Sequence, residues 1–264
     1  MHIRIAQSKT SSPLETAKTC RPRLCKALFV LVTIAWHGAG AGQQHVRHAL
    51  GGFECAATSN GVLIAAQHGT WDSNTATLAI DVARELGAGF VVARQFAPDK
   101  IRIHVTQPAE SALTTCAQES RTERARDVCE MYAFLVGTTA HDKPLRLYVE
   151  IHGNINPHTA RQVEAATIGV PMELAGRVKE AYSTIVGPVR EQLPAYPQLA
   201  LLIEPVDRLL YTAACARKLG IFATAIAPRG IHFELPLAAR AGAVLPGSVS
   251  VIADVVRLLL HEHQ

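Results

Sequence analysis

From residue 61 to the C-terminus, short apolar segments typical of strands alternate with longer segments of helical periodicity. The strand-like segments cover residues 61–66, 90–94, 101–105, 145–151, 200–204, 222–227 and 231–235. The helical segments cover residues 75–86, 122–136, 171–186, 208–219 and 251–261. Strands that alternate with helices of this length predict an α/β fold: a three-layer sandwich with a mainly parallel or mixed central sheet and helices on both faces.

The ends of several predicted helices carry capping residues. Ser73 or Asn74 can cap the helix at 75–86, and Gly87 ends it. Pro171 stands at the start of the helix at 171–186, where its missing N–H costs nothing. These signals support the boundaries drawn from the apolar periodicity.

The first 41 residues have the three-part layout of a secretory signal. Arg21, Arg23 and Lys26 precede an apolar run at 27–36, and the small residues 39–41 offer a cleavage site. We therefore predict a signal peptide at 1–41, an exported protein (periplasmic or secreted) and a single α/β domain at 42–264. About ten apolar residues are too few to span a bilayer, so no stable membrane insertion is expected once the leader is removed. An uncleaved anchor and an upstream start codon are the alternatives.

The net positive charge of the chain comes from this leader. The chain has 26 Lys and Arg against 22 Asp and Glu, and residues 1–41 hold six of the former and one of the latter. The remaining 20 basic and 21 acidic residues give residues 42–264 a net charge of −1. A nucleic-acid-binding surface is therefore not expected.

Four of the six cysteines lie beyond the leader: Cys55, Cys116, Cys129 and Cys215. In an exported protein an even number permits two disulfides, in one of three pairings between which the sequence does not choose. Buried free thiols are the alternative.

Several polar residues follow the predicted strands at the edge of the sheet where α/β proteins bind ligands. His68 and Asp72 lie in the loop after the first of these strands, His152 ends the strand at 145–151, and Glu234 ends the strand at 231–235. Two imidazoles and one carboxylate suit a catalytic Zn²⁺ site whose fourth position is open to water. Bound Zn²⁺ lowers the pKa of water to about 7, and Glu234 can then act as a base.

Other interpretations of these residues remain open. A single histidine is more often a surface residue or a hydrogen-bonded core residue than a ligand. Glu150 shares a strand face with His152, so it either holds that imidazole by a hydrogen bond or is an ordinary polar strand residue. The sequence has no G-x-S-x-G, G-x-x-x-x-G-K, H-E-x-x-H or C-x-x-C motif, which disfavours several competing chemistries.

Four stretches together resemble the N-formylglutamate amidohydrolase group within the zinc-carboxypeptidase-like (phosphorylase/hydrolase-like) fold. They are residues 65–72 (AAQHGTWD) followed by Thr75, residues 149–154 (VEIHGN), residues 119–125 (ESRTERA) leading to Tyr132, and residues 231–236 (IHFELP). Residues 103–108 lack the Asp-x-Asn-Arg-Pro of formylglutamate hydrolases. The resemblance therefore implies the metal site rather than that particular substrate.

The resemblance implies a zinc-dependent hydrolase of amide bonds in N-acyl amino acids or short peptides. The implied ligands are His68, Asp72 and His152, and the implied general base and acid is Glu234, which acts on metal-activated water. A nearby cation would bind a substrate carboxylate or stabilise the oxyanion. The candidates for substrate binding are Arg229 first, then Arg161 and Arg102, with Asn154 beside them; each arginine could equally be an ordinary surface residue.

Two other functions remain open. A non-catalytic exported solute-binding protein, or an inactive hydrolase relative, would keep the crevice without turnover. A metal-free hydrolase with a nucleophilic side chain would retain activity in the presence of a chelator.

Overall fold

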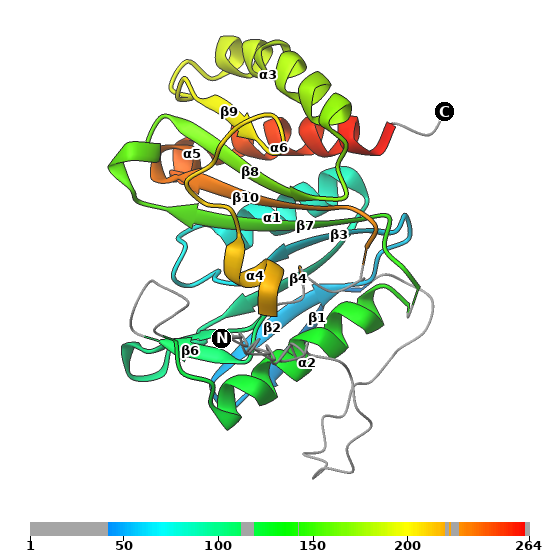
Figure 1. Ribbon diagram of the computed structural model, residues 1–264, viewed down its shortest axis with the longest axis vertical. Coiled ribbons are helices and arrows are strands. Elements are labelled where there is room, and N and C mark those ends of the chain that lie inside the picture. Colours follow the sequence, from blue (N-terminus) through cyan, green and yellow to red (C-terminus); the bar gives the residue numbers. More distant parts are fainter. Residues whose placement is uncertain (1–41, 112–118, 142, 220–221, 223–226, 262–264) are drawn as a thin grey trace, which may run out of the picture.

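A computed structural model describes residues 42–111, 119–141, 143–219, 222 and 227–261 (Figure 1). Its centre is an eight-stranded sheet in the order β1-β2-β4-β3-β7-β10-β8-β9. The strands are β1 (Gln44–His48), β2 (Gly51–Ala56), β3 (Val62–Ala66), β4 (Gly89–Arg94), β7 (Leu147–Asn154), β8 (Gln162–Ile168), β9 (Ala200–Ile203) and β10 (Gly230–Pro236).

The four middle strands, β4, β3, β7 and β10, run parallel to one another. At one edge β1 and β2 form an antiparallel hairpin, and β2 is also antiparallel to β4. At the other edge β8 is antiparallel to β10, and β9 is parallel to β8. The sheet is therefore mixed, which confirms the predicted α/β class.

Helices cover both faces of the sheet. The helices are α1 (Thr75–Leu86), α2 (Glu123–Thr139), α3 (Met172–Gln192), α4 (Ala214–Leu219), α5 (Leu237–Arg240) and α6 (Leu245–Leu260). Val62, Ile64 and Ala66 of β3 belong to the core cluster that includes residues of α1, α3 and α6, whereas Leu63 and Ala65 belong to the cluster that includes residues of α2. Because successive side chains of a strand point to opposite faces, this apolar strand is buried between two helical layers.

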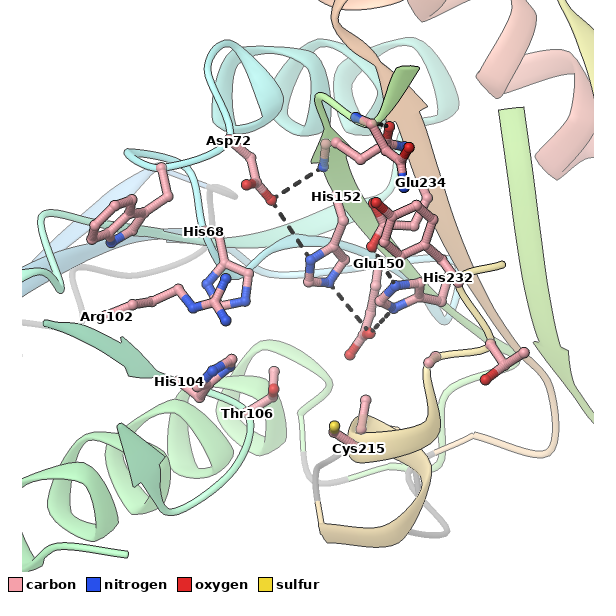
Figure 2. Close-up of a pocket in the computed structure, with 18 of the residues that line it drawn as sticks. His68, Asp72, Arg102, His104, Thr106, Glu150, His152, Cys215, His232 and Glu234 are labelled. Carbon is pink, nitrogen blue, oxygen red and sulfur yellow. Dashed lines mark hydrogen bonds and ion pairs between the residues drawn. The ribbon is translucent and has the colours of Figure 1, made fainter. Parts of the chain in front are cut away.

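A small second sheet stands beside the central one. Its strands, β5 (Arg102–His104) and β6 (Ala109–Ser111), are antiparallel. The strand predicted at 101–105 therefore exists, but it belongs to this hairpin rather than to the central sheet. The hairpin places Arg102 and His104 beside the ends of the central strands (Figure 2).

The helix predicted at 208–219 is wrong in its first half, because only Ala214–Leu219 is helical. The buried carboxylate of Glu164 accepts the backbone N–H groups of Leu210 (3.2 Å) and Tyr211 (2.7 Å). Ala213 has a left-handed backbone, with φ of 51°. Both features hold residues 210–213 away from helical geometry. The strand predicted at 222–227 lies mostly outside the described residues.

Other elements differ in extent from the prediction. Strands β1, β2, β6 and β8 are not predicted from the sequence. Helix α3 continues to Gln192 with Pro188 inside it. Helix α6 begins at Leu245, six residues before the predicted start, with Pro246 in its first turn.

Of the two alternatives for the cysteines, two disulfides or buried free thiols, the first does not hold. Cys55 is a buried free thiol on β2 that packs in the core beneath α2, so the four cysteines cannot form two bridges. Cys215 is disulfide-bonded.

The predicted leader at 1–41 lies outside the described residues, so the signal peptide and export stay predictions. Among the residues that are described, one helical stretch, Gly242–Leu260, is long and apolar enough to cross a membrane. Half of that stretch is buried, and α6 packs against α1 and α3 as part of the core.

Candidate functional site

A cavity of about 620 Å³ opens at the carboxyl ends of β3, β7 and β10 (Figure 2). Parallel strands end at the same edge of a sheet, so polar residues at these ends come together. Three pairs of ionisable residues contribute, one from each strand or the loop after it: His68 and Asp72, Glu150 and His152, and His232 and Glu234. In the parallel register His232 pairs with Glu150 and Glu234 with His152, so all four side chains share one face.

His152 lies at the centre of this cluster. Its Nδ1 is 3.7 Å from Oδ2 of Asp72, and its Nε2 is 3.6 Å from Oε2 of Glu150. Its ring centroid is 5.1 Å from that of His68 and 4.1 Å from that of His232. The structure therefore places two of the predicted ligands, His68 and Asp72, beside the third, His152.

A second set of residues could also hold a metal ion. Among the described residues, ligand atoms of Glu150, His152 and His232 all lie within 4.8 Å of one another. Oε1 of Glu150 and Nε2 of His152 are buried and have no hydrogen-bond partner. Buried polar atoms without hydrogen-bond partners are rare in native proteins. A bound cation would give these two atoms a partner.

His232 is held between two carboxylates. Its Nδ1 lies 2.7 Å from Oε2 of Glu150, and its Nε2 lies 3.3 Å from Oε1 of Glu234. Burial alone would lower the pKa of His232, but the hydrogen bonds with the two carboxylates raise it to about 9. Burial would raise the pKa of Glu150, yet the contacts with His152 and His232 bring it to about 2. Glu234, His232 and Glu150 therefore form a chain of alternating charge.

The surroundings also shift the pKa values of His68, Asp72 and Glu234. Burial is the largest of the effects that lower the pKa of His68 well below its usual value, and the shift favours the neutral ring. Burial raises the pKa of Asp72, although His152 and the N–H of Gly153 oppose this shift. The pKa of Glu234 is lowered, because its hydrogen bond with His232 outweighs burial.

The β5–β6 hairpin supplies one wall of the cavity. Nε2 of His104 is 2.6 Å from Oε1 of Glu119, and Nη2 of Arg102 is 3.8 Å from the same oxygen. Nε of Arg102 is buried and has no hydrogen-bond partner. Neither His104 nor Glu119 is predicted as a site residue from the sequence.

Arg240 was also missed, and it connects three of the loops that carry the site. The arginine is 1% exposed. It donates hydrogen bonds to the carbonyl oxygens of Ser73 (2.6 Å), Asn154 (3.1 Å) and Leu235 (3.2 Å). These carbonyls follow Asp72, His152 and Glu234 respectively, so one guanidinium fixes the positions of all three strand ends.

The four predicted substrate-binding residues divide into two groups. Arg102 and Asn154 line the cavity. Arg229 lies at the opposite end of β10, where it donates to the carbonyl oxygen of Leu259 (2.7 Å), because it precedes the strand rather than following it. Arg161 is exposed at the start of β8 and is not among the residues that line the cavity. The placement of Arg229 and Arg161 at the site is therefore corrected.

Comparison with known proteins gives a likeness in fold only. No family model matches the chain, and no curated protein does. Among solved structures, a bacteriophage poly-γ-glutamate hydrolase matches with a TM-score of 0.46 and 11% identity, over 84% of this chain and 91% of that one. A zinc-free form of YndL matches with a TM-score of 0.46 and 14% identity, over 81% and 92%.

A metallo-carboxypeptidase from Burkholderia cenocepacia has a TM-score of 0.43 and 13% identity, over 81% of this chain and 65% of that one. The structures that resemble this chain thus include metallopeptidase, carboxypeptidase-like and poly-γ-glutamate hydrolase folds. The narrower resemblance to N-formylglutamate amidohydrolases stays a prediction.

Proposed function

We propose that this protein is a metal-dependent hydrolase that cleaves an amide bond in an N-acyl amino acid or a short peptide. The observation that carries this proposal is the convergence of four imidazoles and three carboxylates on one cavity.

The geometry favours His68, Asp72 and His152 as the ligands. Two ligands of one tetrahedral Zn²⁺, with bonds of about 2.0–2.2 Å, stand about 3.4 Å apart, and Nδ1 of His152 is 3.7 Å from Oδ2 of Asp72. Both ring nitrogens of His232 are already engaged by Glu150 and Glu234.

Glu150 then acts as a positioning residue. Its carboxylate faces Nε2 of His152, the nitrogen on the side of the ring away from Asp72. A carboxylate in this place fixes the orientation of a metal-binding imidazole. Of the two interpretations of Glu150 that the sequence allows, this contact supports the first.

Glu234 is proposed as the general base and acid. Its carboxylate lines the cavity and is held by His232 at 3.3 Å. A bound Zn²⁺ would polarise the scissile carbonyl and lower the pKa of water. Glu234 takes a proton from the attacking water and delivers it to the leaving amine. Arg102 and Asn154, on the cavity wall, are placed to hold the polar groups of the substrate.

Metal analysis and an activity panel test this function. The purified protein should contain close to one equivalent of zinc and should hydrolyse at least one member of a panel of N-acyl amino acids and short peptides. Dialysis against a chelator should abolish the hydrolysis, and added zinc should restore it. Activity that survives the chelator would instead favour a metal-free hydrolase. Export of the protein, proposed from residues 1–41, is tested by N-terminal sequencing of the mature chain.

A further inference from the structure

Large apolar side chains are exposed around the mouth of the cavity. Among the described residues seven large apolar side chains are exposed, and three of them border this cavity: Trp71 (47%), Ile155 (83%) and Leu210 (57%). Single exposed apolar residues are normal on a protein surface. A group of them at the rim of one cavity is instead typical of a binding site.

Two of these residues lie next to proposed metal ligands in the sequence. Trp71 immediately precedes Asp72, so their Cα atoms are about 3.8 Å apart. Ile155 follows Asn154 and is three residues from His152. Both residues line the same cavity as these ligands, so an apolar group that contacts either side chain lies in the cavity of the proposed metal site.

The third side chain belongs to the facing wall, which is held firmly in place. Both oxygens of the Glu164 carboxylate accept backbone N–H groups, one from Leu210 and one from Tyr211. Glu164 itself is only 1% exposed. Because this wall is ordered before binding, the protein loses little conformational entropy when an apolar group of the substrate packs on Leu210.

The cavity offers one arginine side chain to an anionic group of the substrate. Arg102 and Arg240 are the only Arg or Lys residues among those lining the cavity in the described part of the chain. Arg240 is buried and bound to three carbonyl oxygens, which leaves Arg102 to face a substrate. The guanidinium of Arg102 can therefore bind one carboxylate of the substrate.

From these observations we infer that the substrate carries one bulky apolar group next to the scissile amide and one carboxylate. The apolar group packs on Trp71, Ile155 and Leu210, and the carboxylate binds Arg102. This inference rests on the proposed function and narrows its substrate class. The apolar group can be an amino-acid side chain or an acyl chain, which have the same chemistry.

Two substrate series test this inference and distinguish the two sources. The first varies the side chain, from N-acetylalanine to N-acetylleucine and N-acetylphenylalanine, with N-acetylglutamate as the acidic member. The second varies the acyl chain on alanine, from acetyl to octanoyl. We expect kcat/KM to rise about tenfold or more from the smallest to the largest apolar member of one series, since each methylene buried in a pocket has an effect of this order. Rates that stay flat along both series, or that favour N-acetylglutamate, would overturn the inference.

Substitution at the rim should reduce this selectivity. Trp71→Ala is expected to bring the ratio of kcat/KM between the largest and smallest substrates to within about threefold of one. Phe134→Ala is the matched control, because Phe134 is an exposed aromatic residue (59%) on α2 that does not line the cavity. The control should keep the ratio of the native protein. An unchanged ratio in Trp71→Ala would contradict the inference.

A binding measurement keeps the inference testable without turnover. The chain has two tryptophans, so Trp36→Phe in the full chain leaves Trp71 as the only one. In chelator-treated protein, N-acetylphenylalanine or octanoylalanine should change the Trp71 fluorescence saturably, at a concentration at least tenfold lower than N-acetylalanine does. Such binding without hydrolysis of any amide would overturn the proposed function and leave the rim assignment intact. Hydrolysis without preferential binding of the apolar compounds would overturn the rim assignment and leave the proposed function intact.

Discussion

Gly153 packs so closely against Arg240 that any side chain at position 153 would overlap the guanidinium. Gly153 follows His152 directly, and its N–H donates to Oδ2 of Asp72 (3.1 Å). Arg240 in turn holds the carbonyl oxygens of Ser73 and Asn154. The absence of a Cβ therefore allows one buried arginine to fix the geometry on both sides of the proposed metal site.

Gly153→Ala should disturb this arrangement. The new methyl group displaces the guanidinium, so its buried hydrogen bonds are lost or distorted, and we expect the free energy of unfolding to fall by about 2–3 kcal/mol. Metal affinity should fall as well. Urea denaturation and zinc titration measure the two effects.

Gly176→Ala is the matched control. Gly176 lies inside α3, where an added Cβ meets nothing within 4 Å. Because alanine favours a helix by about 1 kcal/mol over glycine, this variant should be slightly more stable than the native protein. Equal effects of the two substitutions would argue against the role given to Gly153.

Asp72→Asn and His232→Gln distinguish the two candidate ligand sets. If His68, Asp72 and His152 bind the metal, Asp72→Asn should weaken zinc affinity more than 100-fold, since it removes a ligand. His232→Gln should lower the affinity by at most about 10–100-fold, because it changes only the surroundings of a ligand. Titration with a chromophoric chelator measures both. The opposite ranking would assign the metal to Glu150, His152 and His232.

The positions of site residues relative to the strand ends explain which of them could be predicted from the sequence. His68, His152 and Glu234 could be placed together from the sequence because parallel strands deliver their ends to one edge of the sheet. Arg229 was misplaced because it stands before β10, at the opposite edge. Its distance along the chain from Glu234 is short, but the intervening strand separates the two residues in space.

Residues from outside the parallel strands could not be predicted in the same way. His104 reaches the cavity from a separate hairpin, whose position relative to the central sheet depends on tertiary packing. Arg240 carries no local signal, because an arginine near a short helix is usually exposed. Strands β1 and β2, at one end of the sheet, were missed since they contain many polar and glycine residues. The helix predicted at 208–219 failed because Glu164, a residue distant in sequence, binds the backbone of its first half.

Cys55 and Cys215 should differ in their reaction with an alkylating reagent. In unfolded protein without reductant, Cys55 should be alkylated because it is a free thiol, whereas Cys215 should react only after reduction. In the native protein burial raises the pKa of the Cys55 thiol, although a hydrogen bond with Thr139 opposes this shift. Since the thiolate is the reactive form, native Cys55 should react slowly at pH 8 and faster at higher pH. Peptide mass spectrometry measures each site, and alkylation of Cys215 without reductant would contradict its disulfide bond.

Glu234→Gln separates an enzyme from a binding protein with the same cavity. Glutamine keeps the shape of the side chain and can still contact His232, but it cannot accept a proton from water. Loss of a general base lowers the rate by about 10²–10⁴-fold, so kcat should fall by this factor while the zinc content stays near one equivalent. Glu173→Gln, at an exposed position on α3, is the control and should keep the native rate. The Glu234→Gln variant should still bind the best substrate in an isothermal titration, because the rim and Arg102 are unchanged. If Glu234→Gln retains the native rate, the proton transfer assigned to this carboxylate is wrong. If the native protein itself binds the compounds without hydrolysing them, it is a binding protein.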